Sequence, residues 1–241
     1  FSILKIVIYI FGIDNLSQIA TTDLMLYIGA ATVLLSSCVA ITKDNLKARL
    51  AYSTVSQLSY IIVGALLATS VAAAGASLHI VTHAVGKITL FFCAGAIMVA
   101  AHKKNISDMV GLGRKMPLTM IAFAVGSMSI IGLPPMAGTW SKWYLMVGAL
   151  EADKLIIVGV LTISTLLNVA YLLPIPIKAF FNTETGQQPW SWSETKEAPL
   201  PMLIAIGVTT AACLVLFFYP QPIIDLINLI PSVSTDTTGL S

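Results

Sequence analysis

Long runs of uncharged residues, separated by short polar segments, set the pattern of this chain. The runs predict helices over 24–42, 49–71, 75–101, 155–177 and 198–219. Each comes close to or exceeds the length of about 20 apolar residues that an α-helix needs to cross a bilayer. The uncharged stretch 50–86 is too long for one span, so we expect a break at the small residues 72–75. The pattern predicts an all-α, polytopic transmembrane helix bundle.

Two segments depart from simple spans. Residues 6–13 have the pattern of the second half of a helix, which favours treating the chain as a C-terminal fragment. The uncharged run 116–141 contains Pro134 and Pro135 shortly after a glycine. Proline lacks a backbone donor and clashes with the preceding helical turn. We therefore expect an interrupted helix near Pro134-Pro135, and seven spans in all when 116–150 counts as one broken span.

The pattern also divides the chain into regions. Residues 1–181 are expected to form a transmembrane domain and 200–220 a terminal transmembrane helix. Between them, the polar segment 182–199 carries Trp190 and Trp192, as is typical of a loop anchored at the membrane interface. Residues 221–241 are expected to form a polar tail.

Composition strengthens the membrane interpretation. Apolar residues make up 57% of the chain and charged residues only 10%, and the mean hydropathy is +0.89. An average soluble domain has about 25% charged residues. These values exclude a disordered chain, a nucleic-acid binder and an ordinary soluble enzyme. Cys38, Cys93 and Cys213 lie within apolar runs, where we expect small core residues and no disulfide or metal framework.

The charges on short loops predict the orientation in the membrane. Loops 43–49 and 102–115 hold most of the Lys and Arg residues and are separated by two helices, so they lie on the same side. The positive-inside rule assigns that side to the cytoplasm. The segment 13–23 carries two aspartates and no Lys, as expected for the external side. If 116–150 is one broken span, 151–154 is external as well.

Three ionisable residues lie in the middle of a predicted span. His79, His83 and Lys87 recur at intervals of four, which places them on one helix face. Lys87 lies too deep for its side chain to reach the interface, and such residues usually face a bundle interior or water and mark an ion path. The alternative is a buried His/Lys set that joins helices by hydrogen bonds. A zinc site is disfavoured, because the metalloprotease glutamate is absent between the two histidines.

Lys142 follows the Pro-Pro break by seven residues. An interrupted helix frees backbone carbonyls and amides inside the membrane, and such breaks occur around cavities or protein-lined paths. We therefore expect Lys142 to handle ions. The alternative is a lysine at a helix end that reaches the headgroups. Lys5 lies in the incomplete first helix, so its depth stays open.

Polar residues on two neighbouring spans form a weaker set of candidates. They are Ser53, Gln57 and Tyr60 on one helix and Thr162, Thr165 and Asn168 on another. Their helical spacing fits the lining of a wetted path, although hydrogen bonding between helices is the commoner reason for such residues. The spans contain no nucleophile elbow, phosphate-binding loop, CxxC pair or carboxylate pair. The sequence thus predicts no catalytic centre, no cofactor and no bound metal.

Three motifs in the chain resemble those of one membrane family, the proton-translocating antiporter-like subunits. The segment 44–57, DNLKARLAYSTVSQ, is similar to the family signature D-x-K-R-x-L-A-Y-S-S/T-x-S-Q. The segment 79–87, HIVTHAVGK, resembles H-x-x-T-H-A-x-x-K. The segment 132–142, GLPPMAGTWSK, resembles G-x-P-P-x-x-G-F-x-S-K, with departures at Thr139 and Trp140. The family comprises the large membrane subunits of respiratory complex I, membrane hydrogenases and Mrp-type cation/proton antiporters.

The resemblance implies a fold and a site. The family has two inverted five-helix repeats, each with one interrupted helix, and a polar axis along the bilayer midplane. This chain would carry the second repeat. The resemblance places His79, His83, Lys87 and Lys142 on that axis and puts a Glu and two Lys of the axis upstream of Phe1. Lys87 and Lys142 are then the expected proton carriers, and the two histidines are relays between them.

The resemblance also implies a function. The ending SKWYL of the third motif and the segment 165–171 look most like the D-type subunit of the Mrp antiporter. The expected protein is a subunit of a multisubunit Na⁺ or K⁺/proton antiporter in the inner (plasma) membrane, with other membrane subunits as partners. One alternative is a proton-pumping subunit of NADH-quinone oxidoreductase (complex I) or a membrane-bound hydrogenase. The other is a structural membrane scaffold without a transport role.

Overall fold

A computed structural model of the chain describes residues 2–17, 19–181 and 196–230. These residues form helices and connecting loops, with one antiparallel bridge between Asn45 and Asn105. In chain order the helices are α1 (Ser2–Ile6), η1 (Val7–Phe11), α2 (Ile13–Ser17), α3 (Ala20–Thr42), α4 (Leu46–Leu66), α5 (Ser70–Ala101), η2 (Ile106–Met109), α6 (Leu112–Lys115), α7 (Pro117–Ile131), α8 (Gly138–Glu151), α9 (Leu155–Leu172), α10 (Pro174–Phe181), α11 (Leu200–Phe218) and α12 (Gln221–Asn228).

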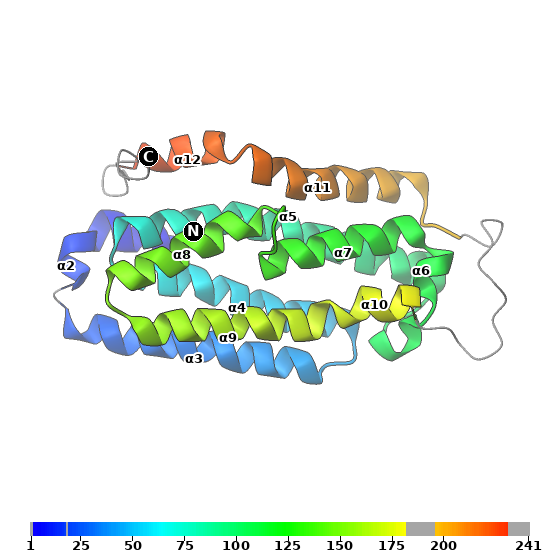
Figure 1. The fold of residues 1–241 in the computed structure, drawn as a ribbon, viewed down its shortest axis with the longest axis horizontal. Coiled ribbons are helices and arrows are strands. Elements are labelled where there is room, and N and C mark those ends of the chain that lie inside the picture. Colours follow the sequence, from blue (N-terminus) through cyan, green and yellow to red (C-terminus); the bar gives the residue numbers. More distant parts are fainter. Residues whose placement is uncertain (1, 18, 182–195, 231–241) are drawn as a thin grey trace.

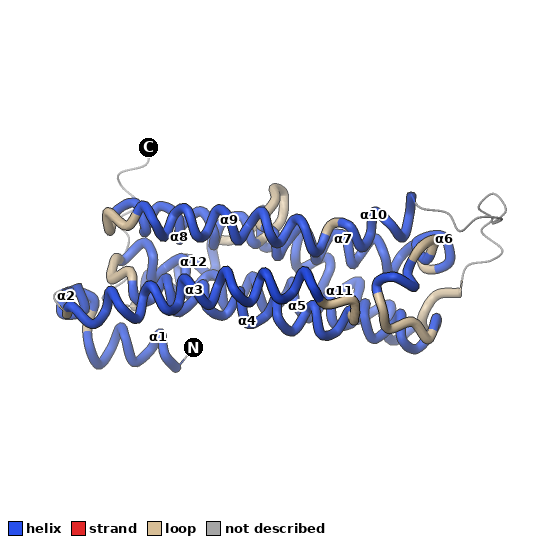
Figure 2. The backbone as a smooth tube through the Cα atoms, turned by 90° about the horizontal axis from the view of Figure 1, so that it is seen from below, coloured by secondary structure: helices blue, strands red, loops and turns tan. Residues whose placement is uncertain are grey.

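The long helices run side by side along the longest axis of the molecule (Figure 1), and most of the connecting loops gather at its two ends (Figure 2). α3 packs on α4 and α9, and α11 packs along α5 and α7. α5, the longest helix at 32 residues, contacts α4, α7, α8 and α11. α5 therefore runs through the interior of the bundle, with other helices packed on several of its sides.

The described helices have the length and apolar character of membrane spans. Four are long and apolar enough to cross a bilayer: Thr21–Thr42, Ser70–Ala101, Leu155–Phe181 and Leu200–Phe218. Two shorter apolar helices cover Ser2–Phe11 and Pro117–Ile131. The 21-residue α4 lies among them and buries several polar residues. The protein is an all-helical membrane protein, as the sequence predicted.

The position predicted for the turn between α4 and α5 is wrong. α5 begins at Ser70, because the hydroxyl oxygen of Thr69 accepts a hydrogen bond from a backbone N–H in the first turn and caps the helix. The small residues 72–75 lie inside α5 and have another role. A Cβ on Gly75 would lie 2.8 Å from the backbone N of Leu145, so the absence of a side chain there lets α8 approach α5 closely.

The interrupted helix near Pro134-Pro135 is confirmed. α7 ends at Ile131 and α8 begins at Gly138, halfway along the bundle in Figure 1. Gly132, at a φ of +85°, ends α7 in the left-handed conformation that favours glycine. The two half-helices meet without space for a side chain, since a Cβ on Gly138 would lie 1.9 Å from the carbonyl oxygen of Ser129.

The loops with most of the basic residues, 43–49 and 102–115, pair with each other at one end of the bundle. Two backbone hydrogen bonds join them, and the Asp44 carboxylate accepts two more from N and Oγ of Ser107. The hydrogen bond from the Ser107 hydroxyl holds the pKa of Asp44 below its usual value. The pairing confirms that the two loops share one end; that this end faces the cytoplasm stays a prediction.

An ion pair joins two segments at the opposite end. Nζ of Lys154 lies 2.8 Å from a carboxylate oxygen of Asp23, beside the start of α3. The hydrogen bond in this pair raises the pKa of Lys154. The contact places 151–154 at the same end as 13–23, as expected for one broken span.

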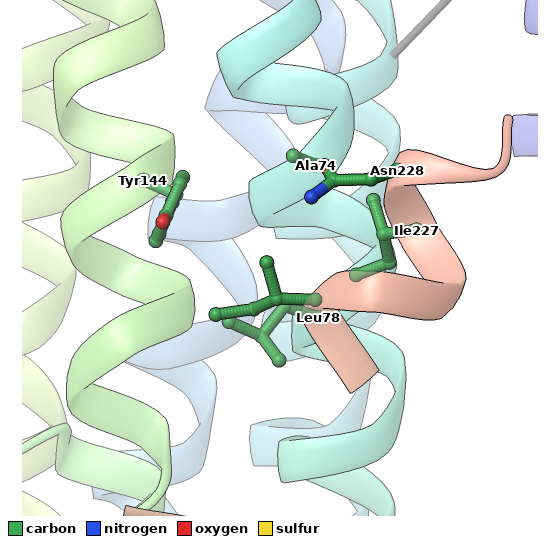
Figure 3. A pocket seen from close by; sticks show the side chains of 6 residues that line it. Ala74, Leu78, Tyr144, Ile227 and Asn228 are labelled. Atoms are coloured by element: carbon green, nitrogen blue, oxygen red, sulfur yellow. The ribbon is translucent and has the colours of Figure 1, made fainter. Parts of the chain in front are cut away.

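Residues near the C-terminus form a short helix in a range expected to be a polar tail. α12 packs Ile227 between Ala74 and Leu78 of α5, with Tyr144 of α8 across a small pocket (Figure 3). The predicted interfacial tryptophans, Trp190 and Trp192, lie outside the described residues.

Candidate functional site

Lys142 lies in the first turns of α8 and is only 5% exposed. Its Nζ donates to the carbonyl oxygen of Ile131 at 2.9 Å. This carbonyl is free because the residue four positions on is Pro135, which has no N–H to complete the helical hydrogen bond. Nζ also donates to Oγ1 of Thr165 at 3.3 Å and lies 5.2 Å from the centroid of the Tyr60 ring. The helix break thus creates the polar environment of this lysine.

Lys87 lies in the middle of α5 and is also 5% exposed. Its Nζ donates to Oγ of Ser53 at 2.7 Å and to the carbonyl oxygen of Leu50 at 3.3 Å, both on α4. Within the described residues, neither Lys87 nor Lys142 has a carboxylate within ion-pair distance; the ion pair of this part of the chain is Lys154–Asp23. Both ammonium groups are therefore buried among neutral partners.

A stack of three rings lies between the two lysines. The Tyr60 ring, which Lys142 faces, stacks on His79 with centroids 5.5 Å apart, and His79 stacks on His83 at 5.8 Å. His83 precedes Lys87 by one helical turn on α5. Contacts therefore link Lys142, Tyr60, His79 and His83, and Lys87 follows His83 at the next turn of α5.

Ser141 joins this stack to the broken helix. Its Oγ lies 2.9 Å from Nδ1 of His79 and accepts a hydrogen bond from Oγ1 of Thr82 at 3.2 Å. It also donates to the carbonyl oxygen of Gly138 at the start of α8. Ser141 therefore positions His79 beside the break, although the sequence indicated it only as the neighbour of Lys142.

Beyond Lys87, a chain of hydroxyl groups continues to α9. The Tyr171 hydroxyl lies 2.8 Å from Oγ of Ser53 and also donates to Oδ1 of Asn168. A phenol has one proton, so Tyr171 donates to one of these two oxygens at a time. Hydrogen bonds thus link Lys87, Ser53, Tyr171 and Asn168.

Arg49 holds the backbone at the end of this series of hydroxyl groups, next to the loop 43–49. Its guanidinium donates to the carbonyl oxygens of Lys43, Ile41 and Tyr171. These hydrogen bonds join the ends of α3 and α9 to the first turn of α4. Arg49 thus anchors the backbone of Tyr171, whose hydroxyl contacts Ser53.

The weaker polar candidates divide into two groups. Ser53, Gln57, Tyr60 and Asn168 are buried, and Thr165 contacts Lys142. Thr162 lies apart from them: it is exposed on the outer face of α9, and its hydroxyl donates to its own helix. Lys5 is also exposed and lies outside the cluster. Ser164, which the sequence did not single out, is buried on α9, and its Oγ lies 3.3 Å from Oγ of Ser37.

Several buried polar atoms of the cluster have no hydrogen-bond partner among the residues that the structure describes. They are both amide atoms of Gln57, Nε2 of His79, Nε2 of His83 and Nδ2 of Asn168. Buried polar atoms are normally hydrogen-bonded, and ordered water is the usual partner where the protein supplies none. Among the described residues, no group of three or more His, Cys, Asp or Glu side chains is arranged to hold a metal ion.

Comparison with known proteins identifies the family. A family described as NADH:quinone oxidoreductase/Mrp antiporter, transmembrane, matches residues 2–168. The chain belongs to this family. The match includes His79, His83, the two buried lysines and the interrupted helix, so the family assignment made from the three motifs is confirmed at this level.

Similar sequences include several quinone oxidoreductase subunits. The chain is 37% identical over 213 residues to NADH-quinone oxidoreductase subunit N of Desulforudis audaxviator, an alignment that covers 85% of this chain and 42% of that relative. It is 34% identical over 177 residues to subunit L from Rickettsia bellii, covering 73% of this chain and 26% of the relative. The chain therefore spans less than half the length of these relatives.

Similar structures come from both branches of the family. The Mrp complex from Dietzia sp. superposes with a TM-score of 0.78 at 20% identity, covering 90% of this chain and 50% of that chain. Respiratory complex I from Thermus thermophilus gives a TM-score of 0.79 at 19% identity, covering 97% and 49%. At these identities the likeness establishes the fold.

Proposed function

We propose that this chain carries part of a proton path across the membrane, with Lys142 and Lys87 as proton carriers and His79 and His83 as relays. The observation that carries the proposal is the run of contacts from Lys142 through Tyr60 and His79 to His83, one helical turn from Lys87. Both lysines are buried and lack a carboxylate partner among the described residues. A structural role for the lysines would favour paired charges, because an unpaired buried charge is costly. The absence of described anionic partners argues for groups that gain and lose protons.

The energetics of such a path depend on hydration. Water around a buried lysine favours its ammonium form, and removal of water favours the neutral amine. Moving one proton against 100 mV requires about 2.3 kcal/mol. This energy equals a change of about two pKa units at 1.36 kcal/mol each. Hydration and dehydration of the polar atoms around His83 and Gln57 would supply changes of this size.

The proposal includes the family architecture and location. The chain would form the second of two inverted repeats, with the interrupted helix α7–α8 at the centre of its path. It would act in the inner (plasma) membrane as one subunit of a larger assembly. Support comes from the family membership and from the break beside Lys142.

Two assemblies remain as candidates. The first is a multisubunit Na⁺ or K⁺/proton antiporter, favoured by the likeness of SKWYL and of segment 165–171 to the D-type Mrp subunit. The second is NADH-quinone oxidoreductase, favoured by the 37% identity to a subunit N. Membrane vesicles containing the full-length protein distinguish them. Proton movement driven by a Na⁺ or K⁺ gradient alone supports the first, and movement that requires NADH and quinone supports the second.

Substitution of a relay tests the proton path in either assembly. His83→Asn in the full-length assembly should slow proton transport by at least about tenfold, because it removes a group that both donates and accepts protons. The matched control is His102→Asn, an exposed histidine at the left-handed end of α5, where asparagine is tolerated. It should keep the wild-type rate, and a chelator should leave the wild type unaffected. Equal rates in both variants would contradict the relay role.

A further inference from the structure

A cavity of about 240 Å³ lies between the paired loops and α5, at the end of the bundle predicted to face the cytoplasm. Lys47, Lys103 and Lys104 line its polar side, and Ala94 and Met98 of α5 line its apolar side. We call it the three-lysine cavity. It lies outside the proton path, and none of its residues contacts Lys87 or Lys142 in the described hydrogen bonds.

The position of the three lysines is fixed by the fold. Lys47 is in the first turn of α4, and Lys103 and Lys104 directly follow α5. The loop pairing brings them together, since Leu46 N donates to the carbonyl oxygen of Lys104 at 3.0 Å. Nζ of Lys103 donates to the backbone carbonyl of Asp108, so this ammonium is held at the loop.

The cavity carries an excess of positive charge. No carboxylate of the described residues forms an ion pair with any of the three lysines. Asp44, the acidic residue nearest to Lys47 along the chain, uses its carboxylate to accept the hydrogen bonds from Ser107. Asp108, the acidic residue nearest to Lys103 and Lys104, offers its backbone carbonyl to Lys103. The three ammonium groups are therefore available to one anionic ligand.

Exposed apolar side chains lie further along both helices that border the cavity. Val55 and Leu58 follow Lys47 on the same face of α4, at helical spacing, and are 46% and 47% exposed. Phe91 precedes Ala94 by three residues on α5 and is also exposed. The two helices thus have cationic groups at their loop end and exposed apolar side chains further along.

We propose that the three-lysine cavity binds an anionic phospholipid, with its phosphate among Lys47, Lys103 and Lys104 and an acyl chain along the apolar faces of α4 and α5. Clusters of basic residues beside a membrane span attract anionic headgroups. A free phosphate has the same charged group as the lipid headgroup. It has no acyl chain, however, that could contact Met98 and the apolar side chains further along the helices. The lipid would bridge the two loops that close this end of the bundle.

The test uses the full-length protein, purified in a neutral detergent and depleted of lipid. Binding of phosphatidylglycerol is measured by native mass spectrometry, with phosphatidylcholine of the same chains and glycerol 3-phosphate as comparison ligands. The variant is K47Q/K103Q/K104Q. The matched control, K115Q/K178Q/K196Q, removes three exposed lysines outside the cavity.

Each lysine near an anionic headgroup strengthens binding about fivefold. The cavity variant should therefore bind phosphatidylglycerol roughly a hundredfold more weakly, while the control changes by less than about threefold. The wild type should bind phosphatidylcholine and glycerol 3-phosphate far more weakly than phosphatidylglycerol. Equal loss in both triple variants would overturn the proposal, because general surface charge would explain it. Equal binding of glycerol 3-phosphate would overturn the assignment to a lipid.

Discussion

Single residues at the candidate site show what helical spacing predicts and what it misses. The intervals between His79, His83 and Lys87 were sufficient to place them on one face, and the prolines were sufficient to place Lys142 beside a break. The partner of Lys142, the carbonyl of Ile131, follows from the missing N–H of Pro135 and could also have been derived. Tyr171 could not, because its contact with Ser53 joins α9 to α4 across 118 residues of sequence.

Tyr171→Phe tests the hydroxyl chain beyond Lys87. The substitution keeps the ring and removes the hydroxyl group that contacts Ser53 and Asn168. We expect slower proton transport by the full-length assembly in a vesicle assay, and a loss of stability of about 1 kcal/mol, typical of a buried hydrogen bond between membrane helices. The control is Tyr52→Phe, an exposed tyrosine whose ring lies beneath Lys43. If the two variants transport equally fast, Tyr171 only supports packing.

At the scale of elements, apolar run length predicted the helices well and their ends less well. The all-helical bundle and the break at Pro134-Pro135 followed from hydropathy and proline chemistry. The turn before α5 was misplaced, because a cluster of small residues marks either a loop or a close helix contact. The cap by Thr69 and the close approach of Gly75 to α8 show that the small residues 72–75 form a helix contact and not a loop. The contact itself depends on residues more than 60 positions away.

Gly148→Ala tests the close approach of α8 to α5. A Cβ at this position would lie 2.5 Å from the backbone N of Ala72, where backbone atoms cannot move aside easily. We expect the variant to lose about 1–3 kcal/mol of stability, as for other overpacked sites, seen as a lower thermal midpoint of the purified full-length protein. Gly159→Ala, on α9, has nothing within 4 Å of its Cβ and should keep or slightly raise the midpoint. Equal midpoints would contradict the tight contact.

At the scale of the whole molecule, the charges on the loops predict an orientation. The structure places 43–49 with 102–115 at one end and 151–154 with Asp23 at the other. This two-ended arrangement could be derived from the sequence, because each complete span reverses the side of the next loop. The direction of the bundle in the membrane depends on the excess of Lys and Arg at one end.

Cysteine labelling tests the orientation. In a full-length variant whose native cysteines are replaced by Ser, single cysteines are introduced at Asn45, Asn105 and Glu151. A membrane-impermeant maleimide added to intact cells should modify position 151 and leave 45 and 105 unmodified until the membrane is permeabilised. Modification of 45 or 105 from outside would reverse the predicted topology and would place the three-lysine cavity at the external leaflet.

The central claim, a proton path through Lys142, is tested most directly by Lys142→Arg in vesicles that contain the full-length assembly. Arginine keeps the positive charge and stays protonated, so it can replace a structural ammonium but cannot release a proton. Proton transport is followed with a pH-sensitive dye, and native gels confirm assembly. The account predicts an assembled complex that no longer transports protons, as for Lys142→Ala. Transport by Lys142→Arg at the wild-type rate would show that the lysine is a structural charge and would contradict the account.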